Sequence, residues 1–97
     1  MDRHDAEQEM SKLRGAIDRV DVALVRLLNQ RARYAVAIGE IKDALLLPIY
    51  APERENEVLE RVESACHGPL AATAVRRLFE RIIEESRRVE RDSTIDG

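Results

Sequence analysis

The sequence predicts an all-α protein with three helices in each chain, one very long and two shorter. Ala, Glu, Lys, Leu and Arg account for about half of the 97 residues, which is typical of long helices and coiled coils. The three prolines, Pro48, Pro52 and Pro69, coincide with both breaks in the helical pattern of apolar residues. No alternation typical of strands continues for more than a few residues. We therefore predict helices over about 6–45, 52–66 and 70–92.

The first predicted helix carries apolar residues at steps that alternate between three and four, which is the seam of a heptad repeat. About 40 residues at about 1.5 Å each form a rod of about 60 Å, which two shorter helices of the same chain cannot cover. We therefore expect a homodimer, either a protruding coiled coil or two intertwined chains. The seam consists of Met10, Leu13, Ile17, Val20, Leu24, Leu27, Tyr34, Ile38, Ile41 and Leu45.

The second and third helices begin and end at recognisable signals. Pro52 suits a first helical position, and Glu53 and Glu55 favour the positive end of a helix dipole. Gly68 is expected to adopt a left-handed conformation after the second helix. We expect one domain over 1–97, with an ordered core over about 8–92 and a frayed tail over 92–97. The third helix is expected to bury Val75, Leu78, Phe79, Ile82 and Ile83.

Composition and charge exclude several classes of function. A formal net charge of −3, one Phe and two Tyr argue against a nucleic-acid partner. Cys66 is the single cysteine and no His or Cys spacing suits a metal, so we expect no disulfide, metal or cofactor. Residues 1–10 are too charged for a signal peptide, and the longest apolar run, 44–49, is too short to span a membrane. We therefore expect a cytoplasmic protein with no membrane partner.

Polar side chains continue the apolar face of each predicted helix. Arg31 occupies a seam position, and Lys42 points in nearly the same direction because eleven residues return a helix to within about 20°. Glu55 shares the inner face of the second helix, and Ser86 and Glu90 extend that of the third. Two interpretations are open: an Arg–Glu pair that fixes the packing register, or a polar pocket that holds an anionic ligand. The coincidence over five positions favours the pocket.

Five short motifs occur in order along most of the chain, and together they are specific although none is decisive alone. They are Leu13–Asp18, Leu27–Arg31, Ile38–Lys42, Pro48–Glu55 and Leu78–Ser86. In this order and spacing, from about Met10 to Arg91, they resemble the all-helical class of chorismate mutases. The resemblance implies an intertwined homodimer with two active sites, each completed by one arginine of the partner chain.

The resemblance also implies roles for individual residues. Arg14 is expected to enter the partner's site, Arg31 to bind the side-chain carboxylate of chorismate, and Lys42 to donate to its ether oxygen. Glu55 is expected to accept a hydrogen bond from the ring hydroxyl, assisted by a backbone N–H near Ala51.

Four further residues complete the implied site. Arg54 is expected to support it electrostatically, and Ser86 to make a polar contact near the ring carboxylate. Ile38 and Ile83 are expected to form apolar walls.

Two positions depart from the pattern of the relatives. Glu90 stands where many relatives have Gln as a second donor to the ether oxygen. An ionised carboxylate cannot donate, so we expect Glu90 to act in its protonated form; the alternative is that it faces solvent at a frayed helix end. Arg87 stands where some relatives have an apolar wall, and it can point outward.

The implied reaction is the rearrangement of chorismate to prephenate in phenylalanine and tyrosine biosynthesis. It needs no nucleophile and no cofactor, only a folded substrate and stabilisation of charge on the ether oxygen. Alternatives on the same fold are an isochorismate pyruvate-lyase, a 4-amino-4-deoxychorismate mutase and a non-catalytic helical dimerisation module. Glu55 argues against the lyase, because its carboxylate suits a ring hydroxyl, but it also suits an ammonium group.

Overall fold

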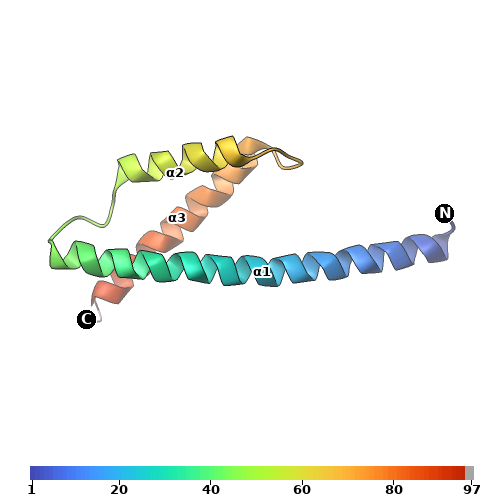
Figure 1. Ribbon diagram of the computed structural model, residues 1–97, viewed down its shortest axis with the longest axis horizontal. Coiled ribbons are helices and arrows are strands. Elements are labelled where there is room, and N and C mark those ends of the chain that lie inside the picture. The colour runs from blue at the N-terminus through green and yellow to red at the C-terminus, as the bar shows by residue number, and fades with distance from the viewer. Residues whose placement is uncertain (96–97) are drawn as a thin grey trace. The chain divides into compact units, whose positions relative to one another are not determined.

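The computed structural model describes residues 1–95 and contains three helices there, α1 (Arg3–Ala44), α2 (Pro52–Ala65) and α3 (Ala72–Ile95) (Figure 1). The predicted all-α fold class and order of helices are therefore confirmed. The predicted end of the third helix at about 92 is wrong, because α3 continues to Ile95. The expected fraying of the tail stays a prediction, and residues 96–97 lie outside the described part. None of the described helices combines the length and apolarity that crossing a membrane requires.

Internal contacts divide the chain into two compact units, Met1–Gln30 and the part that begins at Arg31. The prediction of a single domain stays a prediction. The first unit is the N-terminal part of α1, and the heptad seam is exposed in it. Each of the following seam residues exposes more than half of its surface: Leu13, Ile17, Val20, Leu24 and Leu27.

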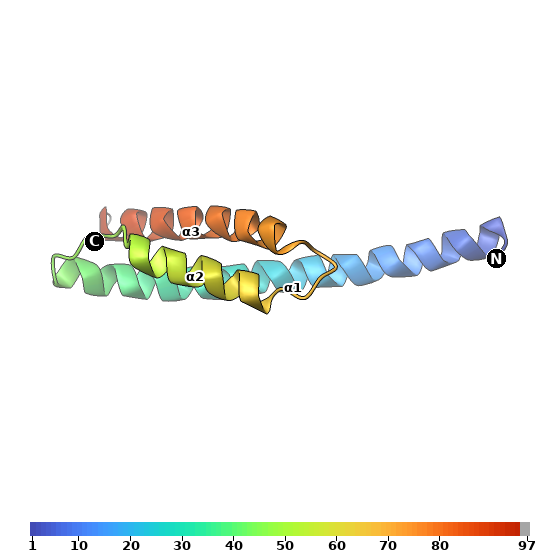
Figure 2. The ribbon, with the colours of Figure 1, turned by 90° about the horizontal axis from the view of Figure 1, so that it is seen from above.

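The second unit contains the last part of α1, together with α2 and α3, which pack against each other (Figures 1 and 2). Its buried apolar residues come from all three elements: Ala35 of α1, Leu59 of α2 and Ile83 of α3. Arg76 of α3 donates to Glu63 of α2 at 2.5 Å, and this hydrogen bond raises the pKa of Arg76. The helix pair is thus held by apolar packing and by a polar contact near the 66–71 connection.

Two expectations for this unit have different outcomes. Gly68 has φ 81°, so its left-handed conformation is confirmed, although it lies in the connection because α2 already ends at Ala65. The expected burial of Leu78 is wrong, since Leu78 is 57% exposed. Successive helical residues differ by about 100° in direction, so the partly covered Phe79 turns inward while Leu78 does not.

Gly39 allows α1 and α3 to approach closely. It is buried, and a Cβ atom added to it would lie 3.2 Å from both Cα and Cβ of Glu90. Such contacts are tighter than ordinary van der Waals packing, so a larger residue would push Glu90 or its helix away. A residue without a side chain at this point therefore helps to place Glu90.

The end of α1 is capped by a left-handed residue that is not glycine. Leu46 has φ 57°, and its N–H donates to the Asp43 carbonyl at 3.2 Å. The Leu47 N–H donates to the Lys42 carbonyl at 2.8 Å, which completes a Schellman motif. Leucine adopts this conformation at a cost of about 1–2 kcal/mol, and the Leu46 side chain recovers little by packing because Leu46 is 92% exposed.

We expect Leu46→Gly to raise the free energy of unfolding by about 0.5–1 kcal/mol, because relief of the left-handed strain outweighs the added flexibility of the unfolded chain. Urea unfolding measures the change. Leu45→Gly is the matched control: Leu45 has no positive φ to relieve, and we expect a loss of about 0.5–1 kcal/mol. A lower stability of Leu46→Gly would contradict the strain argument.

Candidate active site

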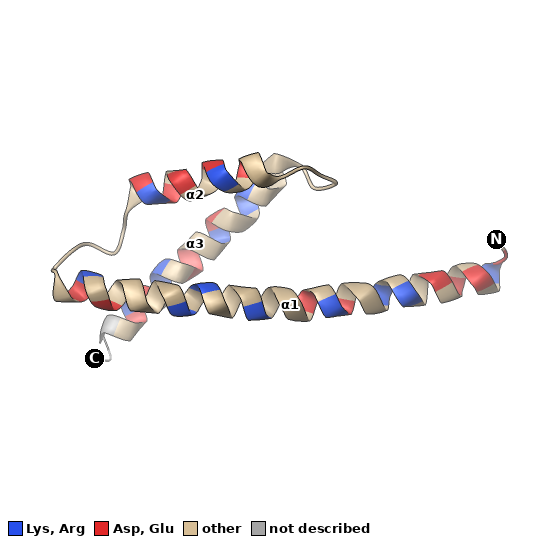
Figure 3. Cartoon of the chain, in the orientation of Figure 1, with Lys and Arg blue, Asp and Glu red and all other residues tan. Residues whose placement is uncertain are grey.

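Charged residues of both signs alternate along α2 and α3 (Figure 3). Many of their ion pairs join neighbouring turns of one helix, such as Arg81 with Glu84 at 3.2 Å, and exposed pairs of this kind contribute little to stability. Besides Arg76–Glu63, two pairs connect different elements and are less exposed than these, Lys42–Glu90 and Arg87–Glu55. Both lie at the wall of one cavity.

This cavity has a volume of about 460 Å³ and lies within the second unit. Its size suits a small organic ligand. Arg14 belongs to the first unit, where it is exposed on α1, and its place in a partner's site stays a prediction. The other nine residues predicted for the site all line the cavity: Arg31, Ile38, Lys42, Ala51, Arg54, Glu55, Ile83, Ser86 and Glu90.

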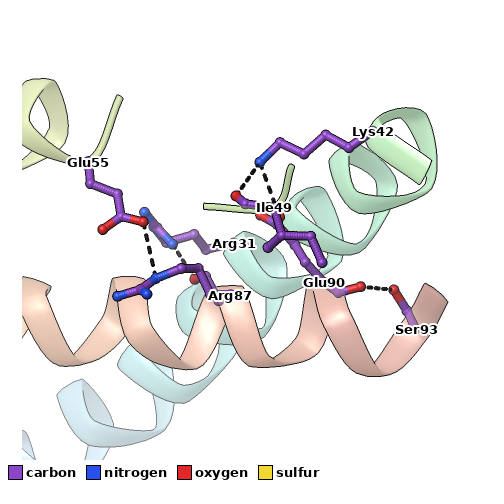
Figure 4. A network of polar contacts seen from close by, with 8 residues as sticks. Arg31, Lys42, Ile49, Glu55, Arg87, Glu90 and Ser93 are labelled. Carbon is purple, nitrogen blue, oxygen red and sulfur yellow. Dashed lines mark hydrogen bonds and ion pairs between the residues drawn. The ribbon is translucent and has the colours of Figure 1, made fainter. Parts of the chain in front are cut away.

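Lys42 is held from two sides at the cavity wall (Figure 4). Its Nζ donates to the Ile49 carbonyl at 2.9 Å and to Glu90 Oε2 at 3.2 Å. It stands in the last turn of α1, where the negative end of the helix dipole favours a cation. Glu90 is only 7% exposed, so the alternative that it faces solvent is wrong.

Arg31 is partly buried on α1 and contacts α3. Its Nη1 donates to Ser86 Oγ at 2.5 Å, and Ser86 in turn donates to the Ile82 carbonyl at 2.9 Å. Burial lowers the pKa of Arg31, Arg54 lowers it further, and Glu90 acts in the opposite direction. An anionic ligand would offset both lowering effects, and the planar fork of guanidinium donors matches a carboxylate.

Glu55 and Arg87 form the other polar side of the cavity (Figure 4). Arg87 Nε lies 3.1 Å from Glu55 Oε2, although the N–H direction does not produce an aligned hydrogen bond. The Arg87 guanidinium also lies over the Tyr50 ring, with Cζ 5.1 Å from the ring centroid. The option that Arg87 points outward is therefore wrong.

The start of α2 forms the rim of the cavity. Ala51 precedes the helix, and Pro52 occupies its first turn, as predicted. The first N–H groups of a helix have no acceptor within it, so this rim offers backbone donors to an anion. Arg54 lines the cavity with a side chain that is 58% exposed, and it pairs with Glu57 at 3.3 Å.

Among the groups at the cavity that sequence reasoning did not assign to the site are the Arg87 side chain, whose direction it left open, and the Ile49 carbonyl. Arg87 follows Ile83 by four residues, so the apolar stripe of α3 contained a signal for it. The Ile49 carbonyl, which accepts from Lys42, belongs to the backbone of a connection and left no signal in the pattern of side chains.

The cavity has an excess of positive charge. Among the described residues that line it, four are cationic and two are carboxylates, which gives a formal charge of +2. Within residues 1–95, no three His, Cys, Asp or Glu side chains are grouped so that they could hold a metal ion. The cations, the hydroxyl group and the backbone N–H donors around the cavity suit an organic dianion.

The family model for chorismate mutase type II matches residues 13–91. The chain belongs to this family. The match covers the cavity residues and α1 from Leu13 onward, and it confirms the family expected from the sequence motifs.

Individual members of the chorismate mutase type II family agree with this assignment. A bifunctional chorismate mutase/prephenate dehydratase of Neisseria gonorrhoeae is 46% identical over 82 residues, which are 84% of this chain and 22% of that protein. The chain thus spans about a fifth of the length of this curated relative.

Two solved chorismate mutases have a similar structure. The enzyme of Thermus thermophilus in its form II has a TM-score of 0.84 and 35% identity, and the match covers 86% of this chain and 94% of that one. The Helicobacter pylori enzyme, solved in complex with prephenate, has a TM-score of 0.85 and 28% identity, with 93% and 98% covered.

Proposed function

We propose that this chain is a chorismate mutase, which rearranges chorismate to prephenate in the biosynthesis of phenylalanine and tyrosine. In this reaction the enolpyruvyl methylene carbon bonds to the ring while the bond from the ring to the ether oxygen breaks. No group is transferred to the protein. The protein has to hold the dianion in a folded conformation and to stabilise the negative charge that grows on the ether oxygen.

The observation that carries the proposal is the pairing of Lys42 with Glu90 inside a cationic cavity. The formal charge of +2 on the lining complements a substrate with two carboxylates. Lys42 is 19% exposed at its side chain, so its charge is shielded little by water and acts strongly on a developing oxyanion. Arg31, whose fork of donors matches a carboxylate, would bind the side-chain carboxylate.

The remaining lining residues fit the other groups of chorismate. Glu55 would accept from the ring hydroxyl, and the backbone near Ala51 would assist it. Ser86 would contact the ring carboxylate, and through its bond with Arg31 it already positions that guanidinium. Arg54 would add positive charge at the rim, while Ile38 and Ile83 would form apolar walls.

The proposal includes an intertwined homodimer in a cytoplasmic location. The exposed seam of α1 supports the dimer, because a continuous apolar row of this length is stabilised when a partner helix covers it. Arg14 lies on the same part of α1, and we propose that it enters the partner's cavity. Each site would then combine residues of two chains.

The direct test is to incubate the purified 97-residue chain with chorismate and to follow the loss of its ultraviolet absorbance. We expect turnover to prephenate, identified as the product by mass spectrometry. Isochorismate in a parallel assay would release pyruvate if the chain were a lyase. A folded dimer that converts neither substrate would support the alternative of a dimerisation module.

The assigned role of Glu90 requires a proton on its carboxyl group. Only the protonated carboxyl can donate to the ether oxygen, and an ionised Glu90 would repel the charge that develops there. We therefore expect kcat/KM to fall as rising pH removes this proton. Glu90→Gln, which donates at every pH, should flatten that decrease, as measured by pH–rate profiles of both proteins.

The control for this prediction is Glu84→Gln, which removes a carboxylate from the exposed face of α3. Its profile should follow that of the unchanged protein. Profiles that are the same for the unchanged protein and for Glu90→Gln would show that Glu90 does not donate this proton.

A further inference from the structure

We propose that Arg87 is a specificity-determining residue, which makes the site favour a neutral hydroxyl over an ammonium group at the ring position that faces Glu55. The inference rests on the proposed function, because it concerns the choice between chorismate and 4-amino-4-deoxychorismate. Glu55 alone does not make this choice, since a carboxylate accepts hydrogen bonds from either group.

Arg87 lies directly beside Glu55. Arg87 Nε lies 3.1 Å from Glu55 Oε2, and the side chains are 33% and 20% exposed. On its other side the guanidinium lies over the Tyr50 ring at 5.1 Å, in the range of cation–π attraction. Contacts from two directions fix the cation beside the carboxylate, and Arg87 lines the cavity itself (Figure 4).

The charges then distinguish the two ligand groups. A hydroxyl needs only an acceptor, and the ion pair uses Oε2 of a carboxylate that has a second oxygen. An ammonium group gains most from a carboxylate whose charge is not already balanced. Here the guanidinium balances that charge and repels a second cation nearby, and partial burial strengthens the repulsion. The ion pair therefore leaves hydrogen bonding to a hydroxyl intact and weakens the attraction for an ammonium.

Arg87 could instead serve only to hold α2 and α3 together. That role predicts that loss of Arg87 would lower kcat/KM for both substrates in parallel or destabilise the fold. The specificity role predicts a change in the ratio of the two kcat/KM values, which a uniform structural defect does not produce.

The test compares Arg87→Met with Arg88→Met in the full chain. Methionine keeps an unbranched stem that can pack on Tyr50, and Arg88 is an exposed neighbour whose side chain is 60% exposed. We expect Arg87→Met to shift the ratio of kcat/KM for chorismate over the amino analogue toward the analogue by about tenfold or more. Arg88→Met should leave the ratio unchanged. If the unchanged protein does not convert the analogue, the analogue is tested as a competitive inhibitor of chorismate turnover. Its inhibition constant then provides the comparison.

Arg87→Lys keeps the charge and should retain the original preference, while Arg87→Gln is a second neutral variant if methionine prevents folding. Folded neutral variants with an unchanged ratio would overturn the inference, although the proposed mutase activity would stand. An unchanged protein that prefers the amino analogue would also overturn it. If the unchanged protein acts on neither substrate, the proposed function fails, and the inference fails with it.

Discussion

Lys42→Met is expected to lower kcat by about a thousandfold, with a much smaller change in KM. A cation aimed at the ether oxygen stabilises charge that exists mainly in the transition state, so its loss appears in kcat. Methionine keeps most of the apolar stem and removes the ammonium that contacts Ile49 and Glu90. Steady-state rates with chorismate measure the effect.

Lys42→Met also leaves Glu90 buried without its partner, which is expected to lower the stability by about 1–3 kcal/mol. The double variant Lys42→Met with Glu90→Gln removes that buried carboxylate. It should regain stability while it remains slow, which separates a catalytic loss from a folding defect. Lys12→Met, at the exposed second lysine, is the matched control. A folded Lys42→Met variant that keeps more than about a tenth of the kcat would contradict the assigned role.

The second large effect concerns the dimer. Arg14→Ala alone is expected to lower kcat/KM by about a hundredfold, because in the proposed dimer it removes one cation that faces the substrate. When Arg14→Ala and Lys42→Met chains exchange subunits, half of the dimers combine one chain of each kind. Each mixed dimer has one site that contains both Arg14 and Lys42. The mixture should therefore recover about a quarter of the activity of the unchanged protein.

Mixing Arg31→Ala with Lys42→Met is the control. In the proposed dimer, Arg31 and Lys42 of one site come from the same chain, so every site in this mixture lacks one of them. No activity should return. Mass spectrometry of the exchanged dimers shows whether mixed pairs have formed. Recovery in the control, or no recovery in the first mixture despite mixed pairs, would contradict a site shared in this way.

Periodicity predicted which helical side chains could meet in the cavity. Arg31 and Lys42 share a direction because eleven residues make about three turns, and both line the cavity. Glu90 follows Ser86 on the stripe of α3, and both reach the same cavity as the residues of α1. Because helical geometry is regular, spacing alone was sufficient to predict that these residues share the inward face of their helix.

Features that depend on backbone geometry outside the helices could not be predicted in this way. Lys42 donates to the Ile49 carbonyl, which depends on the path of the connection between α1 and α2. Leu46 adopts a left-handed cap where the sequence has no glycine to indicate it. Arg87 lies on a helix, but its position left open whether it points outward, and the structure shows that it lines the cavity.

The close approach at Gly39 has a consequence for how this protein can change during evolution. No side-chain layer lies between α1 and α3 at Glu90, so repacking cannot adjust the spacing of the Lys42–Glu90 pair. Arg87 and Glu55 instead meet through long side chains from α3 and α2. Under the proposed role of Arg87, new substrate preferences can therefore arise by exchange at Arg87 while the Lys42–Glu90 pair is inherited unchanged.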